Sequence, residues 1–165
     1  MPILSEIDQK PEEFMQALKD FVGCPRGYLL LAGKNGNGKS FSARAIFDHF
    51  RHLDNQFWNQ AALNMKWQEY HIQYHDTSYL LNEILKAPLL VLDDIGTRKP
   101  SDAFMDFLYT IADQRYENRG NFGTIITTNL NTQTMREMMG DAFVSRVSSG
   151  ICVRNDGPDR RSNKF

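Results

Sequence analysis

Short apolar runs alternate with amphipathic segments along the chain. Residues 28–32 and 88–92 are apolar at nearly every position, and residues 123–128 are rich in β-branched side chains. Strands that are covered on both faces of a parallel sheet have this composition. Residues 56–60 and 150–153 are predicted to form two further short strands, which makes five strands in all.

The segments between these runs have the periodicity of helices. In residues 11–22, Phe14, Leu18 and Phe21 fall on one face, and Pro11 suits the first turn. This helix is either a packed element of the core or a docking segment for a partner. Further helices are predicted over residues 39 to about 53, 61–71, 77–86, 101–118, 132–139 and 141–147, with Ser101 as the N-cap of the longest. The alternation predicts an α/β fold, a parallel five-stranded sheet with helices on both faces.

The composition is that of one packed domain, since 41% of the 165 residues are hydrophobic and 24% are charged. Cys24 and Cys152 lack the spacing of a metal site, so we expect buried, reduced thiols in a cytoplasmic protein. The sequence after Met1 does not have the pattern of a signal peptide. No apolar run approaches the ~20 residues of a membrane span.

A net charge of −1 gives no general attraction for nucleic acid, so DNA binding would depend on a local basic patch. Lys66 and Trp67 combine a cation with a stacking surface, and Arg98 and Lys99 lie on a predicted loop. Packing of the tryptophan in the core and solvation of the charges explain both pairs more simply.

A glycine-rich loop follows the first strand, and it matches the pattern G-x-x-x-x-G-K-S/T from Gly33 to Ser40. Glycines permit the positive φ angles with which successive N–H groups converge on phosphate oxygens, and the following helix adds its dipole. Lys39 is expected to neutralise the β- and γ-phosphates of ATP, and the Ser40 hydroxyl to bind Mg²⁺. The predicted nucleotide-binding residues are Gly33, Asn35, Gly36, Asn37, Gly38, Lys39, Ser40 and Phe41.

Two carboxylates, Asp93 and Asp94, follow the run at residues 88–92, which brings them to the edge of the sheet that carries the phosphate loop. We expect Asp93 to hold Mg²⁺ and Asp94 to orient the attacking water. A strand-end aspartate that caps a turn is the alternative. Asn129 ends the next strand, where its amide either reaches the γ-phosphate or forms a turn.

Three of the arginines beyond these motifs are candidates for a role at the phosphates. Arg146 follows Ser145 on a short predicted helix, where it is either an arginine finger for a neighbouring subunit or a surface side chain. Arg160 and Arg161 either contact phosphate or belong to a solvated tail.

The order of these motifs resembles the DnaC helicase loaders and the related IstB transposition helpers, which are AAA+ P-loop ATPases. The resemblance covers residues 28–153 and includes Leu-Asp-Asp-Ile-Gly, Gln-Arg-Tyr-Glu-Asn-Arg, Thr-Thr-Asn-Leu and Ser-Arg-Val. It implies that Lys39 and Ser40 are the Walker A pair, that Asp93 and Asp94 form Walker B, and that Asn129 is sensor 1. It also implies that Arg146 is the arginine finger, and that Arg160 or Arg161 is near the sensor 2 position.

The resemblance divides the chain into an N-terminal helix and linker (residues 1–27), an AAA+ core (28–153) and a C-terminal tail (154–165). It leaves room for a reduced or absent lid, and for only 27 residues in place of the family's partner-binding region. The Asp at position 94, where many AAA+ proteins have Glu, favours ATP binding over fast hydrolysis.

The leading interpretation is a helicase loader with slow, assembly-dependent ATP hydrolysis, a replicative helicase as partner, single-stranded DNA as a further ligand, and self-association through the edge that carries Arg146. The alternatives are a transposition helper of the IstB type and an ATP-dependent binding module with little turnover. A small-molecule kinase fits poorly, because nothing in the sequence supplies an arginine-bearing lid.

Overall fold

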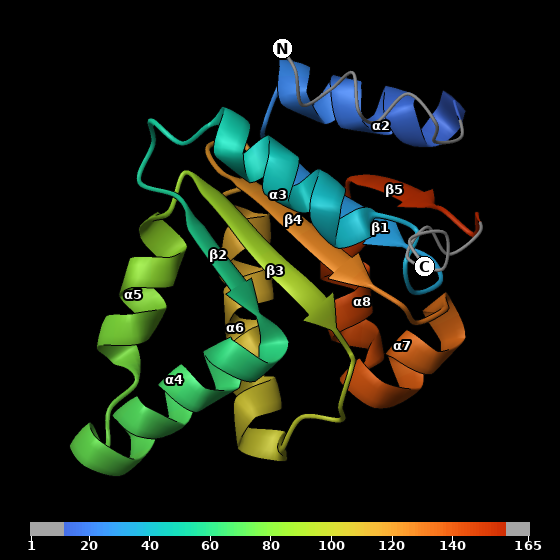
Figure 1. Cartoon of the computed structure of the whole chain (residues 1–165). Coiled ribbons are helices and arrows are strands. Elements are labelled where there is room, and N and C mark those ends of the chain that lie inside the picture. Colours follow the sequence, from blue (N-terminus) through green and yellow to red (C-terminus); the bar gives the residue numbers. More distant parts are fainter. Residues whose placement is uncertain (1–11, 158–165) are drawn as a thin grey trace, which may run out of the picture.

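The computed structural model describes residues 12–157, which form one five-stranded, wholly parallel sheet with the order β2-β3-β4-β1-β5 (Figure 1). The predicted α/β class and five-stranded parallel sheet are confirmed. The strands are β1 (Gly27–Ala32), β2 (Gln56–Asn59), β3 (Leu89–Ile95), β4 (Gly123–Thr128) and β5 (Ile151–Arg154). The helices are α2 (Glu12–Gly23), α3 (Lys39–His49), α4 (Gln60–Tyr74), α5 (Ser78–Lys86), α6 (Asp102–Glu117), α7 (Thr132–Met139) and α8 (Asp141–Val147).

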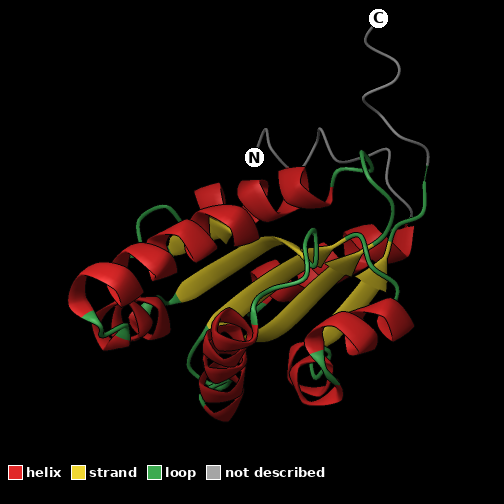
Figure 2. Ribbon diagram, turned by 90° about the horizontal axis from the view of Figure 1, so that it is seen from below, coloured by secondary structure: helices red, strands yellow, loops and turns green. Residues whose placement is uncertain are grey.

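Helices cover both faces of the sheet, as the edge-on view shows (Figure 2). Side chains of α2 and α3 pack with Leu29, Leu31, Val91 and Ile125 on one face. Side chains of α4 to α8 pack on the other face with Tyr28, Leu30, Leu90, Leu92 and Ile126. This alternation of the strand residues between two apolar layers explains why the strands are apolar at nearly every position.

The first helix is a packed element of the core. Phe14, Leu18 and Phe21 of α2 are each 0% exposed, and they pack against β1 and α3. Of the two roles predicted for this helix, the structure therefore places its apolar face in the core. Pro11 lies outside the described residues.

Side-chain caps shift several predicted boundaries. The helix predicted to reach about residue 53 ends at His49, because the Asn55 side chain donates to the Phe50 carbonyl oxygen at 2.7 Å and closes a turn. The strand predicted to end at Gln60 ends at Asn59, whose side chain accepts from the Ala62 N–H at 2.7 Å and starts α4. The predicted cap of α6 is confirmed, since Ser101 Oγ accepts from the Phe104 N–H.

The prediction of buried cysteines is wrong. Cys24 and Cys152 are both exposed and unpaired with each other. Cys24 follows the end of α2 in a turn, and Cys152 lies on β5, which is an edge strand of the sheet that residues 12–157 form. Between Glu12 and Gly157, no helix has the length and apolarity that crossing a bilayer requires.

The strand order creates a switch point beside β1. The chain leaves β1 toward α3 on one face of the sheet and leaves the adjacent strand β4 toward α7 and α8 on the other face. Adjacent strands whose connections diverge in this way leave a crevice at their carboxyl ends, where ligands of open α/β sheets bind.

Candidate nucleotide-binding site

The glycine-rich loop occupies the switch point between β1 and α3, in the strand–loop–helix context that the sequence predicts. Gly33, Gly36 and Gly38 have φ angles of 136°, 76° and 88°, so all three adopt the positive φ that the motif requires. Gly38 is the residue before α3, so the N-terminus of that helix, with its positive dipole end, adjoins the loop. A Cβ on Gly33 would overlap the carbonyl oxygen of Asn155.

The lysine of the loop is held by the loop itself. Lys39 is 4% exposed, and its Nζ donates to the Lys34 carbonyl oxygen at 2.7 Å and to Asn37 Oδ1 at 3.2 Å. Of the other predicted nucleotide-binding residues, Ser40 is half-buried at the start of α3, whereas Asn35 and Phe41 are exposed.

Asn155, which the sequence analysis missed, holds this loop through hydrogen bonds to Ala32 and Asn37. Asn155, which follows β5, is 2% exposed, and its backbone N–H donates to the Ala32 carbonyl oxygen at 2.9 Å. Its carbonyl oxygen accepts from Asn37 Nδ2, and its own amide donates to the Asn37 carbonyl oxygen at 3.3 Å. No local pattern marks this contact, because 118 residues separate the two asparagines.

The acidic pair lies on β3, which continues to Ile95 through an irregularity between Leu92 and Ile95. Asp94 has a φ of 55°, a left-handed conformation that residues with a Cβ rarely adopt, although Asp tolerates it better than most. Regular strand geometry would direct Asp93 and Asp94 to opposite faces, and a bulge re-aims one of them. Asp93 is 7% exposed and Asp94 is half-buried, so both carboxylates lie at the carboxyl edge of the sheet.

Thr127 of β4 holds both acidic residues and was also missed from the sequence. Its hydroxyl donates to Asp93 Oδ1 at 2.6 Å and accepts from the Asp94 N–H at 2.9 Å. The side chain is 0% exposed, so these bonds are shielded from water. The sequence alone indicates only that Thr127 is a β-branched residue of a strand. Asn129 follows β4 directly, half-buried at the same edge.

The donor set suits Mg²⁺. Magnesium in nucleotide sites takes one or two protein oxygens and completes its shell with phosphate oxygens and water. Asp93 has one oxygen bonded to Thr127 and a second for a metal, and Ser40 adds a hydroxyl at the start of α3. Among residues 12–157, no three His, Cys, Asp or Glu side chains form a cluster that would hold a metal without phosphate.

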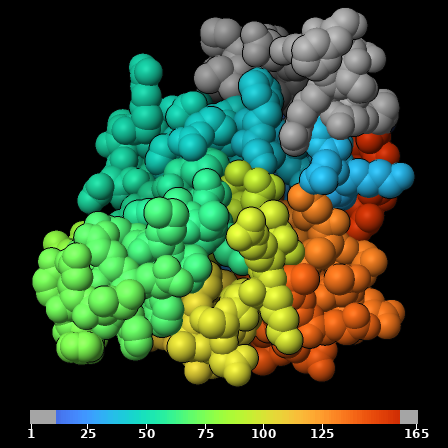
Figure 3. Space-filling view, turned by 60° about the horizontal axis from the view of Figure 1, so that its bottom comes forward, coloured from blue at the N-terminus to red at the C-terminus, as the bar shows by residue number. Residues whose placement is uncertain are grey.

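A cavity of about 610 Å³ lies between α4 and the segment that follows β3, and Asp94 is part of its lining (Figure 3). The Gln60 side chain fixes that segment, since it accepts from the Gly96 N–H and donates to the Arg98 carbonyl oxygen, both at 2.8 Å. Arg98 and Lys99, both exposed, line the same cavity. This part of the site is therefore open and basic beside the acidic pair.

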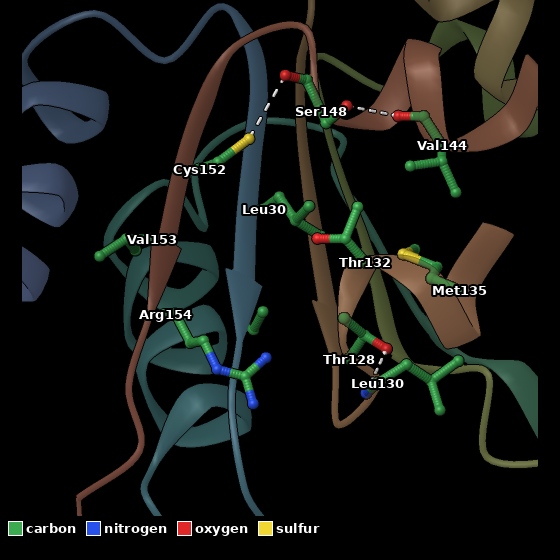
Figure 4. Close-up of a pocket in the computed structure, with 11 residues that line it drawn as sticks. Leu30, Thr128, Leu130, Thr132, Met135, Val144, Ser148, Cys152, Val153 and Arg154 are labelled. Atoms are coloured by element: carbon green, nitrogen blue, oxygen red, sulfur yellow. Dashed lines mark hydrogen bonds between the residues drawn. The ribbon is translucent and has the colours of Figure 1, made fainter. Parts of the chain in front are cut away.

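A smaller pocket of about 200 Å³ lies beyond Ala32, on the face covered by α7 and α8 (Figure 4). Its wall is mainly apolar, with Leu30, Leu130 and Met135, and Arg154 lies at its rim. Pockets for drug-sized ligands start near 300 Å³, so this hollow does not take a whole nucleotide.

Arg146 does not lie at this edge of the sheet. Its Nε donates to Asp113 Oδ1 at 2.7 Å. The neighbouring carbonyl, that of Ala112, accepts from the hydroxyl of Tyr28 at the beginning of β1. Arg146 thus lies toward the amino ends of the strands, whereas the phosphate loop follows their carboxyl ends.

The structure also decides between the two explanations of Lys66 and Trp67. Trp67 is 8% exposed and packs against Phe104, and Lys66 Nζ pairs with Glu69 at 2.9 Å. Trp67 is therefore a core residue and offers no stacking surface for DNA. Arg160 and Arg161 lie outside the described residues.

The phosphate loop follows β1, the acidic pair ends β3, and the polar residue Asn129 follows β4, which lies between those two strands. This arrangement defines an AAA+ P-loop core. The chain belongs to the IstB-like ATP binding protein family, whose model matches residues 5–148. ATP binding is the property that this family shares.

Solved structures support the same fold. The DnaC helicase loader aligns with a TM-score of 0.74 at 23% identity, over 89% of this chain and 92% of that one. DnaI aligns with a TM-score of 0.76 at 21% identity, over 96% and 89%. The replication initiator DnaA bound to AMPPCP and single-stranded DNA aligns with a TM-score of 0.78 at 17% identity, over 91% of this chain and 47% of that one. At these identities the likeness concerns the fold.

One curated relative comes from Escherichia coli (strain K12), where it is called uncharacterized protein YdaV. It is 26% identical over 148 residues, which are 88% of this chain and 55% of the relative. The chain thus spans about half the length of this relative.

Proposed function

We propose that this protein is an ATP-controlled helicase loader that hydrolyses ATP slowly and in an assembled state. The observation that supports the proposal is the distance between the phosphate site and Arg146. The phosphate loop and acidic pair lie at the carboxyl edge of the sheet, and Arg146 lies toward the amino edge.

We assign the following roles within the site. ATP binds on the phosphate loop, where Lys39 exchanges its contacts with Lys34 and Asn37 for phosphate oxygens. Ser40 and Asp93 hold Mg²⁺, which offsets the charge of the phosphates when bound. Asp94 orients the attacking water and Asn129 reaches the γ-phosphate. Because Asp is one methylene shorter than Glu, the base is distant and turnover is slow.

Arg146 acts on the nucleotide of a neighbouring subunit. Residues 28–32 of β1 separate the level of Arg146 from the phosphate loop, and at ~3.3 Å per residue they span roughly 15 Å. No single side chain covers that length, so Arg146 does not reach its own ATP. An arginine supplied in trans is worth ~10³–10⁵ in the rate of phosphoryl transfer.

Mixing two inactive variants tests this arrangement. Lys39→Ala removes the phosphate ligand and Arg146→Ala removes the finger, so each supplies what the other lacks. We expect ATP hydrolysis per subunit to rise with the concentration of the wild-type protein, and the mixture to recover part of that activity. Flat turnover with concentration, together with an inactive mixture, would refute the trans arrangement.

The partner is tested separately. We expect affinity purification of the full chain with ATP to retain a ring-shaped replicative helicase. The family match over residues 5–148 supports a second candidate, a transposition helper of the IstB type, for which a transposase would be retained instead.

A binding module with little turnover is the third candidate. The strained, short Asp94 supports it. Nucleotide-dependent retention of a partner, without hydrolysis in a single-turnover assay at any protein concentration, would favour that function over the loader.

A further inference from the structure

Two residues near the end of α6, Asp113 and Tyr116, form a platform that holds Arg146. Its Nε donates to Asp113 Oδ1 at 2.7 Å, and its Cζ lies 4.8 Å from the ring centroid of Tyr116. The Arg146 and Asp113 side chains are 31% and 35% exposed, so the pair is neither solvated freely nor buried. The hydrogen bond that the guanidinium donates to Asp113 raises the pKa of Arg146 above its usual range.

The nitrogen that makes this bond matters for function. Asp113 engages Nε, and within residues 12–157 the two terminal nitrogens of Arg146 have no hydrogen-bond partner. An arginine binds phosphate through a fork of parallel N–H groups. A guanidinium that is fixed at Nε keeps its terminal pair for such a contact. In an arginine held in an inactive position, we would expect the two terminal nitrogens to be bonded to other groups of the protein.

The platform itself is rigid because Arg115 anchors it. Arg115 is 1% exposed and donates to Thr124 Oγ1 and to the Gly123 carbonyl oxygen at the start of β4, at 2.7 and 2.6 Å. It also donates to the carbonyl oxygens of Ile84, Leu85 and Ala87 at the end of α5. Asp113 and Tyr116, on either side of this anchor, are therefore fixed relative to the sheet.

We propose that Asp113 and Tyr116 are positioning residues for Arg146, which they hold with its terminal nitrogens ready for the triphosphate bound by a second copy of this chain. The inference rests on the proposed trans role of Arg146. It gives a function to the segment from Asp113 to Tyr116, which the phosphate site leaves unexplained. Preorganisation matters here because an unrestrained arginine loses rotamer freedom when it engages phosphate.

The test compares steady-state ATP hydrolysis by full-length variants at protein concentrations where the wild type is assembled. Asp113→Ala removes the acceptor, and we expect kcat to fall about 10–30-fold, the factor that corresponds to restored arginine rotamer freedom. We expect the KM for ATP to stay unchanged, because the variant's own phosphate loop is intact. Asp113→Asn keeps an oxygen acceptor for Nε and should recover most of the activity.

Arg119→Ala is the matched control. Arg119 lies 4.3 Å from the centroid of the same Tyr116 ring, but its own hydrogen bond goes to the Tyr116 carbonyl oxygen. Removing it takes an equal charge from the same surface and leaves Arg146 in place. We expect near wild-type turnover. An equal loss in Arg119→Ala would overturn the proposal in favour of a general effect of charge at this edge.

A second readout separates positioning from stability. In an Arg146→Ala background, Asp113→Ala should cause no further loss of turnover, because there is no finger left to position. Additive losses, unchanged turnover of Asp113→Ala alone, or an increase in its turnover would each overturn the inference, the last by showing that Asp113 restrains the finger. These outcomes leave the proposed function standing. Concentration-independent turnover of the wild type would refute the trans role and the inference with it.

Discussion

Replacing Thr127 by valine should lower both the ATP turnover of the site and the stability of the chain. The two side chains have nearly the same shape, and the substitution removes only the hydroxyl that links Asp93 and Asp94. The carboxylate of Asp93 then loses a buried donor, and the Asp94 N–H loses its acceptor while Asp94 keeps its strained φ of 55°.

The size of the effect follows from these two bonds. A hydrogen bond to a charged group contributes about 1.5–3 kcal/mol, and leaving a buried N–H unpaired costs a further ~1–3 kcal/mol. If the first contribution orients Asp93 for Mg²⁺, its loss lowers kcat/KM for ATP about 10–100-fold. The second contribution lowers the free energy of unfolding, and at about 2–4 °C per kcal/mol it lowers the Tm by several degrees.

The assay measures ATP turnover as a function of Mg²⁺ concentration, with Tm by calorimetry on the same samples. Thr128→Val is the matched control, since Thr128 is also buried but donates to the Ile95 carbonyl oxygen instead of a carboxylate. We expect Thr128→Val to lose stability only, and Thr127→Ser to keep both bonds and most activity. Equal turnover in Thr127→Val and Thr128→Val would refute the reasoning.

Three further substitutions address Asp94, Gly33 and Arg115 separately. Asp94→Asn should bind ATP and lose turnover, and loss of Mg²⁺-dependent binding in Asp94→Asn but not in Asp93→Asn would reverse the two roles. Gly33→Ala should lose nucleotide affinity in a titration with a fluorescent ATP analogue, because its φ of 136° and the Asn155 carbonyl oxygen leave no room for a Cβ; wild-type affinity would contradict this. Arg115→Met should lower the free energy of unfolding by about 2–6 kcal/mol in a urea titration, since it removes the donors to the buried Ala87 and Gly123 carbonyl oxygens, at about 1–3 kcal/mol each; a change under 1 kcal/mol would show that the anchor is dispensable.

The main strands of the sheet could be predicted from the sequence, because each is marked by a run of consecutive residues. Buried strands need apolar side chains on both faces, and residues 28–32, 88–92 and 123–128 have them. The phosphate loop could be predicted for a related reason, since its glycines and Lys39 are adjacent in sequence.

The supporting contacts could not be predicted, because they join residues that are far apart in sequence. Thr127 and Asp93 are 34 positions apart, and Asn37 and Asn155 are 118 apart. Gln60 belongs to the same group, 36 positions before Gly96, and it was assigned to the end of a strand. In each case the side chain has no distinctive neighbours in sequence, and only the packing of the sheet gives it a partner.

The central claim is that the carboxyl edge of the sheet binds ATP through the phosphate loop. Calorimetric titration of the wild-type chain and of Lys39→Ala with ATP and Mg²⁺ tests it most directly, because Lys39 Nζ lies within the loop, where it donates to the Lys34 carbonyl oxygen and to Asn37 Oδ1. We expect saturable binding by the wild type, and no measurable binding by Lys39→Ala at an unchanged Tm. Equal affinity of the two proteins, or no binding by a folded wild type, would contradict the account.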